Sequence, residues 1–132
     1  MKGVDTNILV RFLVGDDGGQ AKKVYRIFKM AESEKSELFV PFLVTLELIW
    51  VLESVYRISR SDILGSISEL LLMPILQFEH QSVLQRFIPS AQTNKYDLSD
   101  LLIAYSAKSQ GCEKVITFDK KASTFHLFEL VQ

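Results

Sequence analysis

Short apolar runs alternate along this chain with longer segments in which apolar residues recur every three or four positions. The short runs are typical of buried strands, and they predict strands at residues 2–5, 38–41, 75–78, 114–118 and 127–131. The longer segments predict helices at residues 7–14, 20–35, 43–56, 80–87 and 97–110, with one more that ends near residue 72. Because residues 43–56 are apolar on nearly every side, we expect that helix to be mostly buried.

Turn-forming residues separate these segments. The run Gly15-Asp16-Asp17-Gly18-Gly19 ends the first helix, Ser59 or Ser61 caps the fourth, and Pro74 stops it. Pro89 is expected to kink or end the fifth helix, and Gly111 to end the sixth. The alternation of strands and helices predicts a three-layer α/β/α fold with a mainly parallel five-stranded sheet, formed by residues 1–132 as a single domain.

Composition narrows the class of protein. With 48% hydrophobic and 23% charged residues, the chain of 132 residues is typical of a globular protein. A mean hydropathy of +0.16 indicates apolar surface that a partner covers, in a homodimer or a hetero-oligomer. The single Cys112 forms no intrachain disulfide, and no uncharged apolar stretch reaches the ~18 residues of a membrane span. We therefore expect a cytoplasmic protein that does not bind membranes.

The candidate chemistry lies in acids that interrupt or border the apolar runs, namely Asp5, Glu47, Asp100 and Asp119. A buried carboxylate is costly unless a cation or several hydrogen-bond donors compensate it. Asp5 and Asp119 each follow a predicted strand, and binding sites of parallel sheets form at the carboxyl ends of strands. Asp97 and Asp100 share one face of a helix.

We expect these acids to converge and to hold a divalent cation. Like charges packed closely would otherwise repel one another and retain protons. Mg²⁺ and Mn²⁺ prefer oxygen ligands, and the chain has no His or Cys cluster that favours zinc. The net charge of the chain is −1, which gives it no overall attraction for RNA. A bound divalent cation would make the acidic site locally positive, so RNA remains a possible substrate.

Four segments, in this order, resemble the signature segments of PIN-domain ribonucleases, as found in VapC-type toxins: Val4-Asp5-Thr6-Asn7-Ile8-Leu9-Val10-Arg11, Glu47-Leu48-Ile49-Trp50-Val51-Leu52, Asp97-Leu98-Ser99-Asp100-Leu101-Leu102-Ile103-Ala104 and Thr117-Phe118-Asp119-Lys120-Lys121. The resemblance spans the whole chain. It differs only at Leu98-Ser99, where relatives often have Phe-Ala.

The resemblance implies a metal-dependent endoribonuclease that is the toxin of a type II toxin–antitoxin pair, with RNA as substrate and a cognate antitoxin as partner. It implies that Asp5, Glu47, Asp100 and Asp119 form the catalytic acidic site for Mg²⁺ or Mn²⁺, with Asp97 as a further carboxylate ligand. The supporting residues it implies are Thr6, Asn7 and Thr117: Asn7 orients Asp5 by hydrogen bonding, and the two threonines place hydroxyls on carboxylates or on water. The metal polarises the scissile phosphate and activates water, which leaves 5′-phosphate and 3′-hydroxyl ends.

Other interpretations account for some of the same residues. Asp5 and Asp97 are also typical helix caps, and Asp119 before two lysines is also a typical turn residue. A receiver-like Mg²⁺-binding signalling domain has a similar length and an acidic sheet edge, but it needs adjacent acids where this chain has Asp5 alone. A catalytically silent PIN-like interaction module is a further alternative. A dinucleotide-binding module is disfavoured because no Gly-x-Gly-x-x-Gly follows the first strand.

Overall fold

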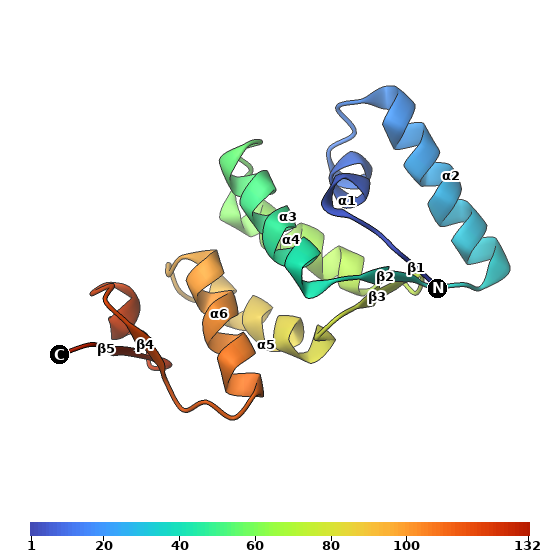
Figure 1. Cartoon of the computed structure of the whole chain (residues 1–132). Helices are drawn as coiled ribbons and strands as arrows, with labels where there is room; N and C mark the ends of the chain where they lie inside the picture. Colours follow the sequence, from blue (N-terminus) through green and yellow to red (C-terminus); the bar gives the residue numbers. More distant parts are fainter. The chain divides into compact units, whose positions relative to one another are not determined.

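The computed structural model describes every residue from Met1 to Gln132, and the chain forms two compact units, Met1–Gln81 and Ser82–Gln132 (Figure 1). In chain order the elements are β1 (Lys2–Gly3), α1 (Thr6–Leu13), α2 (Gly18–Glu34), β2 (Leu38–Val40), α3 (Phe42–Ser54), α4 (Arg60–Leu71), β3 (Leu76–Phe78), α5 (Gln81–Gln92), α6 (Leu98–Ser109), β4 (Val115–Thr117), a 3₁₀ turn η1 (Ala122–Thr124) and β5 (Phe128–Leu130).

The first unit is built on a parallel sheet in the order β1-β2-β3, whose strands lie side by side in Figure 1. Lys2 is in register with Leu38, and Leu38 is in register with Leu76. Helix α1 packs against α2 and α3, and α3 packs against α4. Buried aliphatic side chains such as Leu9 and Leu48 fill the core, which follows from their spacing along these helices.

The second unit contains α6, β4, η1 and β5, and most of α5. Strands β4 and β5 form a parallel pair in which Val115 is in register with Phe128. Phe87 on α5 and Leu98 and Leu101 on α6 are fully buried. Helix α6 begins at the cap Asp97 and ends before Gly111, whose φ of +93° favours glycine.

The predicted α/β class is confirmed. All five expected strands are present and every strand pairing is parallel, as a set of three in the first unit and a pair in the second. The six expected helices are present, with small shifts at their ends except at the end of α5, and only the short turn η1 was not predicted. No helix is both long and apolar enough to span a membrane.

One predicted helix end is wrong. Helix α5 continues through Pro89 to Gln92 instead of ending near Phe87. A proline inside a helix removes one backbone donor and disturbs the preceding turn, at a cost of about 3 kcal/mol. Ala91, one turn after Phe87, is buried on the same side, so packing of this last turn offsets the cost.

The expectation that α3 is mostly buried is also wrong. The helix turns Leu48, Ile49 and Leu52 into the core. Its opposite face carries Leu43 and Trp50, which are 77% and 56% exposed, with the exposed Glu47 between them. Helix α3 is apolar on nearly every side, but this face of it is exposed, because no other element of the first unit covers it.

Candidate functional site

Asp5 lies where the chain leaves β1 and enters α1. Its backbone is extended, and its Oδ1 accepts a hydrogen bond of 3.3 Å from the backbone N–H of Ile8. The side chain thereby satisfies one of the donors that the first helical turn leaves unpaired. Asp5 is therefore an exposed helix cap placed at the carboxyl end of a parallel strand.

The neighbours of Asp5 differ in burial. Thr6 is buried, whereas Asn7 is exposed. Asn7 makes no hydrogen bond to Asp5, so the expected orienting contact is not present in the structure. Its side chain instead lines a groove between α1 and α2.

Glu47 lies in the second turn of α3 and points outward, on the exposed face described above. The amino end of α3 follows Pro41, which provides no side-chain cap. The missing cap comes from a distant residue: Glu79, directly after β3, accepts a hydrogen bond of 2.8 Å from the backbone N–H of Phe42. Sequence reasoning missed Glu79, although an acid that directly follows a predicted strand was the same signal that singled out Asp119.

In the second unit, Asp97 and Asp100 lie at the start of α6. Asp97 caps the helix, because its Oδ1 accepts a hydrogen bond of 3.1 Å from the backbone N–H of Asp100. The pKa of the Asp100 carboxyl is raised above its ordinary value, first by burial and then by the negative charges of Asp97 and Asp119. Asp100 is therefore close enough to both Asp97 and Asp119 to interact with them electrostatically.

Asp119 is held in a turn after β4. Its Oδ1 accepts hydrogen bonds from the backbone N–H groups of Lys121 at 2.9 Å and Ala122 at 3.0 Å. The hydroxyl of Thr117 accepts a hydrogen bond of 3.0 Å from the Asp119 backbone N–H. Thr117 thus contacts the backbone of Asp119 and not its carboxylate. This contact fixes the position of the Asp119 backbone, from which the carboxylate extends.

The helix caps Asp5 and Asp97 and the turn residue Asp119 share one arrangement. Each uses Oδ1 for the backbone, and the second carboxylate oxygen makes no hydrogen bond. A carboxylate has several acceptor positions, so capping and ligand binding are compatible in one side chain. Capping also removes rotational freedom, which orients the second oxygen.

Because Asp5, Glu47, Asp100 and Asp119 interrupt or border apolar runs, they were expected to be buried. This is wrong for three of them, since Asp5, Glu47 and Asp119 are exposed and Asp100 is half-buried. Asp97 is exposed as well. Each acid is on the solvent side of an apolar segment, because helices turn only one face inward and strand ends reach the surface. Water, not a counter-charge, therefore solvates most of these carboxylates.

The donor chemistry fits a hard divalent cation. The acids of the first unit, Asp5 and Glu47, and the acids of the second unit all offer oxygen, which Mg²⁺ and Mn²⁺ prefer. The structure contains no group of three His, Cys, Asp or Glu side chains already in metal-binding geometry. The acids are thus candidate ligands by type and placement and not a preformed cage.

Arg11 does not neutralise Asp5. Its guanidinium donates hydrogen bonds to Gln20 at 2.7 Å, to Asp16 at 2.9 Å and to the hydroxyl of Tyr56 at 3.2 Å. Tyr56 in turn donates to Asp16 at 2.9 Å. The Tyr56 hydrogen bond is the main factor that raises the pKa of Arg11. This cluster connects α1, the start of α2 and the segment after α3.

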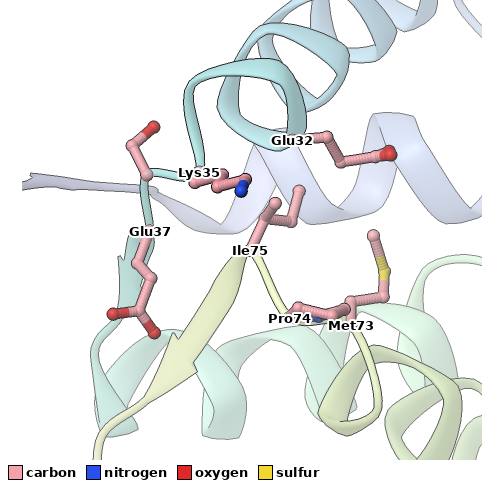
Figure 2. A pocket seen from close by; sticks show the side chains of 7 residues that line it. Glu32, Lys35, Glu37, Met73, Pro74 and Ile75 are labelled. Carbon is pink, nitrogen blue, oxygen red and sulfur yellow. The ribbon is translucent and has the colours of Figure 1, made fainter.

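A pocket lies at the amino ends of strands β2 and β3. It has a volume of about 630 Å³ and is lined by residues that precede β2 and β3, including Glu37 and Ile75, together with Glu32 and Lys35 from the end of α2 (Figure 2). Asp5, the candidate acid at a strand end of the first unit, follows β1, whereas this pocket is at the amino ends of β2 and β3. Its lining has two glutamates and one lysine, so the net negative charge of this pocket does not fit a polyanionic substrate.

Comparison with known proteins gives a consistent result. The PIN domain family matches residues 3–126, a span that includes every candidate acid. A VapC ribonuclease of Aquifex aeolicus (strain VF5) is 26% identical over 121 residues, which cover 92% of this chain and 89% of that relative. The family match spans well over half of the chain and agrees with the α/β fold, the parallel strands and the acids at strand ends. The chain therefore belongs to the PIN domain family.

Proposed function

We propose that this protein is an endoribonuclease that requires Mg²⁺ or Mn²⁺. The observation that carries the proposal is the placement of Asp100 in the second unit near Asp97 and Asp119, where burial and then the charges of these two acids raise its pKa. Membership of the PIN domain family and the similarity to a VapC ribonuclease support the same conclusion. The receiver-like alternative gains no support, since the family match covers the segment on which it depended.

We assign the ion to the carboxylates of Asp5, Glu47, Asp97, Asp100 and Asp119. Asp5 and Glu47 belong to the first unit, and Asp97, Asp100 and Asp119 belong to the second. A bound divalent ion would supply charge neutralisation at the scissile phosphate and water activation at neutral pH. This chemistry needs no covalent protein nucleophile, and the one cysteine, Cys112, is free and exposed.

The chain's own residues orient the carboxylates. Backbone hydrogen bonds hold one oxygen of Asp5, Asp97 and Asp119, and Thr117 fixes the backbone of Asp119. Such preorganisation lowers the cost of bringing like charges together when substrate binds. Thr6 and Asn7 belong to the same proposed site by their place beside Asp5.

The test is cleavage of a structured RNA with Mn²⁺ present, followed by analysis of the product ends. We expect 5′-phosphate and 3′-hydroxyl products from the wild type and at least a 100-fold loss in Asp5→Asn and Asp100→Asn, a loss typical of removing a key catalytic group. Asparagine caps helices as well as aspartate does, so Asp5→Asn removes the charge while keeping the cap. Unchanged cleavage in both variants would refute the proposal.

We further propose that the protein is the toxin of a toxin–antitoxin pair. The exposed apolar face of α3, with Leu43 and Trp50 on either side of Glu47, is the kind of surface that a small inhibitory protein covers. We expect the protein encoded directly upstream to bind and to stop RNA cleavage. Light scattering of the mixture measures the complex and separates it from a homodimer. A monomer that neither binds that protein nor is inhibited by it would count against the toxin role.

A further inference from the structure

A groove with a volume of about 270 Å³ lies between α1 and α2. Ile8, Val24 and Ile27 give it an apolar lining, and Asn7, Arg11 and Lys23 contribute polar groups. No acidic residue lines it. The groove begins at Asn7, two residues after the candidate ligand Asp5, so it lies in the first unit next to one of the proposed catalytic carboxylates.

The two cations of the groove differ in how they are held. Arg11 is fixed by its hydrogen bonds to Gln20, Asp16 and Tyr56. Lys23 is exposed and makes no ion pair or hydrogen bond. A lysine without a partner at the edge of an apolar groove can bind an anion that enters the groove. No existing ion pair has to break, and the main cost is the entropy lost when the lysine side chain becomes ordered.

Helix periodicity places Lys23 and Ile27 on one face of α2, one turn apart. The neighbouring Lys22 is also exposed, but it does not line the groove, because one residue along a helix is a rotation of about 100°. The chain thus offers two adjacent lysines on the same helix, one at the groove and one away from it.

We propose that the groove between α1 and α2 binds a nucleotide of the RNA strand next to the cleaved bond, with the base against Ile8 and Ile27 and the phosphate on Lys23. This inference rests on the proposed ribonuclease function. Charge complementarity favours the phosphate of an RNA strand, since Lys23 is unpaired and no acid lines the groove, whereas the charge of Arg11 is already paired with Asp16. Its volume is slightly below the ~300–1,000 Å³ of pockets for whole small molecules, which suits one unit of a polymer.

The test compares Lys23→Glu with the matched control Lys22→Glu, which makes the same charge change on the same helix. The probe is a fluorescein-labelled single-stranded RNA of about 12 nucleotides and mixed sequence. We expect Lys23→Glu to weaken binding about fivefold to tenfold more than Lys22→Glu does, and to reduce the slope of log K against log salt by about 0.7. In cleavage, Lys23→Glu should raise KM and leave kcat unchanged, because the contact binds ground state and transition state alike. Lys23→Arg should restore binding.

A second variant tests the apolar part of the groove. Ile27→Ala should weaken binding without changing the salt slope, since no charge is lost. Ile27 is 45% exposed, so the melting temperature should remain close to that of the wild type.

Equal effects of Lys23→Glu and Lys22→Glu on RNA would overturn the groove proposal while leaving the ribonuclease proposal intact. Absence of RNA cleavage by the wild type would refute both. If Lys23→Glu keeps RNA binding but escapes inhibition by the upstream protein, the groove binds a peptide and the RNA assignment is wrong.

Discussion

The carboxylate of Glu79 accepts a hydrogen bond of 2.8 Å from the backbone N–H of Phe42, which lies 37 positions earlier in the chain. This contact caps α3 from the end of β3. Glu47 lies five residues after Phe42 in α3, so the contact also helps to fix the backbone position of Glu47. The backbone N–H of Glu79 donates to Val40 at 2.9 Å, so the same residue joins β2, β3 and α3.

Glu79→Ala should lower the free energy of unfolding by about 0.5–2 kcal/mol, because the half-buried N–H of Phe42 loses its acceptor. Glu79→Gln keeps an acceptor oxygen and should lose less. Urea unfolding measures both, with Glu37→Ala as an exposed control. Equal stability of Glu79→Ala and Glu37→Ala would show that Glu79 does not stabilise α3.

Asp97 has two candidate roles that substitutions separate. Asp97→Asn keeps the cap on α6 and removes a charge that repels Asp100, so metal-free stability should be the same or slightly higher, while the rise in melting temperature on adding Mn²⁺ becomes smaller. Asp97→Ala should lose the cap as well, at about 0.5–2 kcal/mol. A wild-type response of Asp97→Asn to Mn²⁺ would make Asp97 a cap and not a ligand.

Ionisation of Asp100 should destabilise the metal-free protein. The pKa of its carboxyl in the folded state is raised above the ordinary value of 3.8, so the folded state binds more protons than the unfolded state just above that value. Stability contributed by this group therefore falls as pH rises through the interval between the two pKa values. Asp100→Asn lacks this loss and should be at least as stable as the wild type at neutral pH.

Urea unfolding in EDTA from about pH 4 to pH 8 should show the advantage of Asp100→Asn appearing as the pH rises. An advantage that instead grows as pH falls would contradict the sign of the pKa shift. Because Asp100 is half-buried, water screens part of the effect, and we expect a small difference.

Added Mg²⁺ or Mn²⁺ should raise the melting temperature of the wild type more than that of Asp100→Asn. A ligand that binds only the folded state stabilises it by mass action, by about 2.7 kcal/mol at a hundred times its Kd. Differential scanning fluorimetry measures the shift, with Ca²⁺-free buffer and EDTA as the baseline. A destabilised Asp100→Asn with a wild-type metal response would refute the shared metal site.

The Arg11 cluster should behave as a unit. Tyr56→Phe removes the hydroxyl that contacts both Arg11 and Asp16, which should cost about 0.5–1.5 kcal/mol. Arg11→Met breaks the same contacts from the other side. The double variant should therefore lose less stability than the sum of the two single variants. Additive losses would mean that the two side chains do not cooperate.

The sequence by itself determined the elements and their order. Strand and helix periods depend on local side-chain alternation, so the five strands, the six helices and the caps at Asp5, Asp97 and Ser59 follow from residues close together in the chain. Four ordered motifs were also enough to predict the PIN domain family. The roles of the acids as metal ligands stay predictions.

Only the tertiary structure decided which face of each element is covered. Leu43, Glu47 and Trp50 belong to an apolar helix, yet they are exposed, because burial depends on what packs against a helix and not on its composition. The same holds for the Glu79 cap on Phe42 and for the Arg11–Tyr56 contact, which join residues 37 and 45 positions apart. Contacts over such distances leave no periodic signal in the sequence, since they form only when packing brings separate elements together.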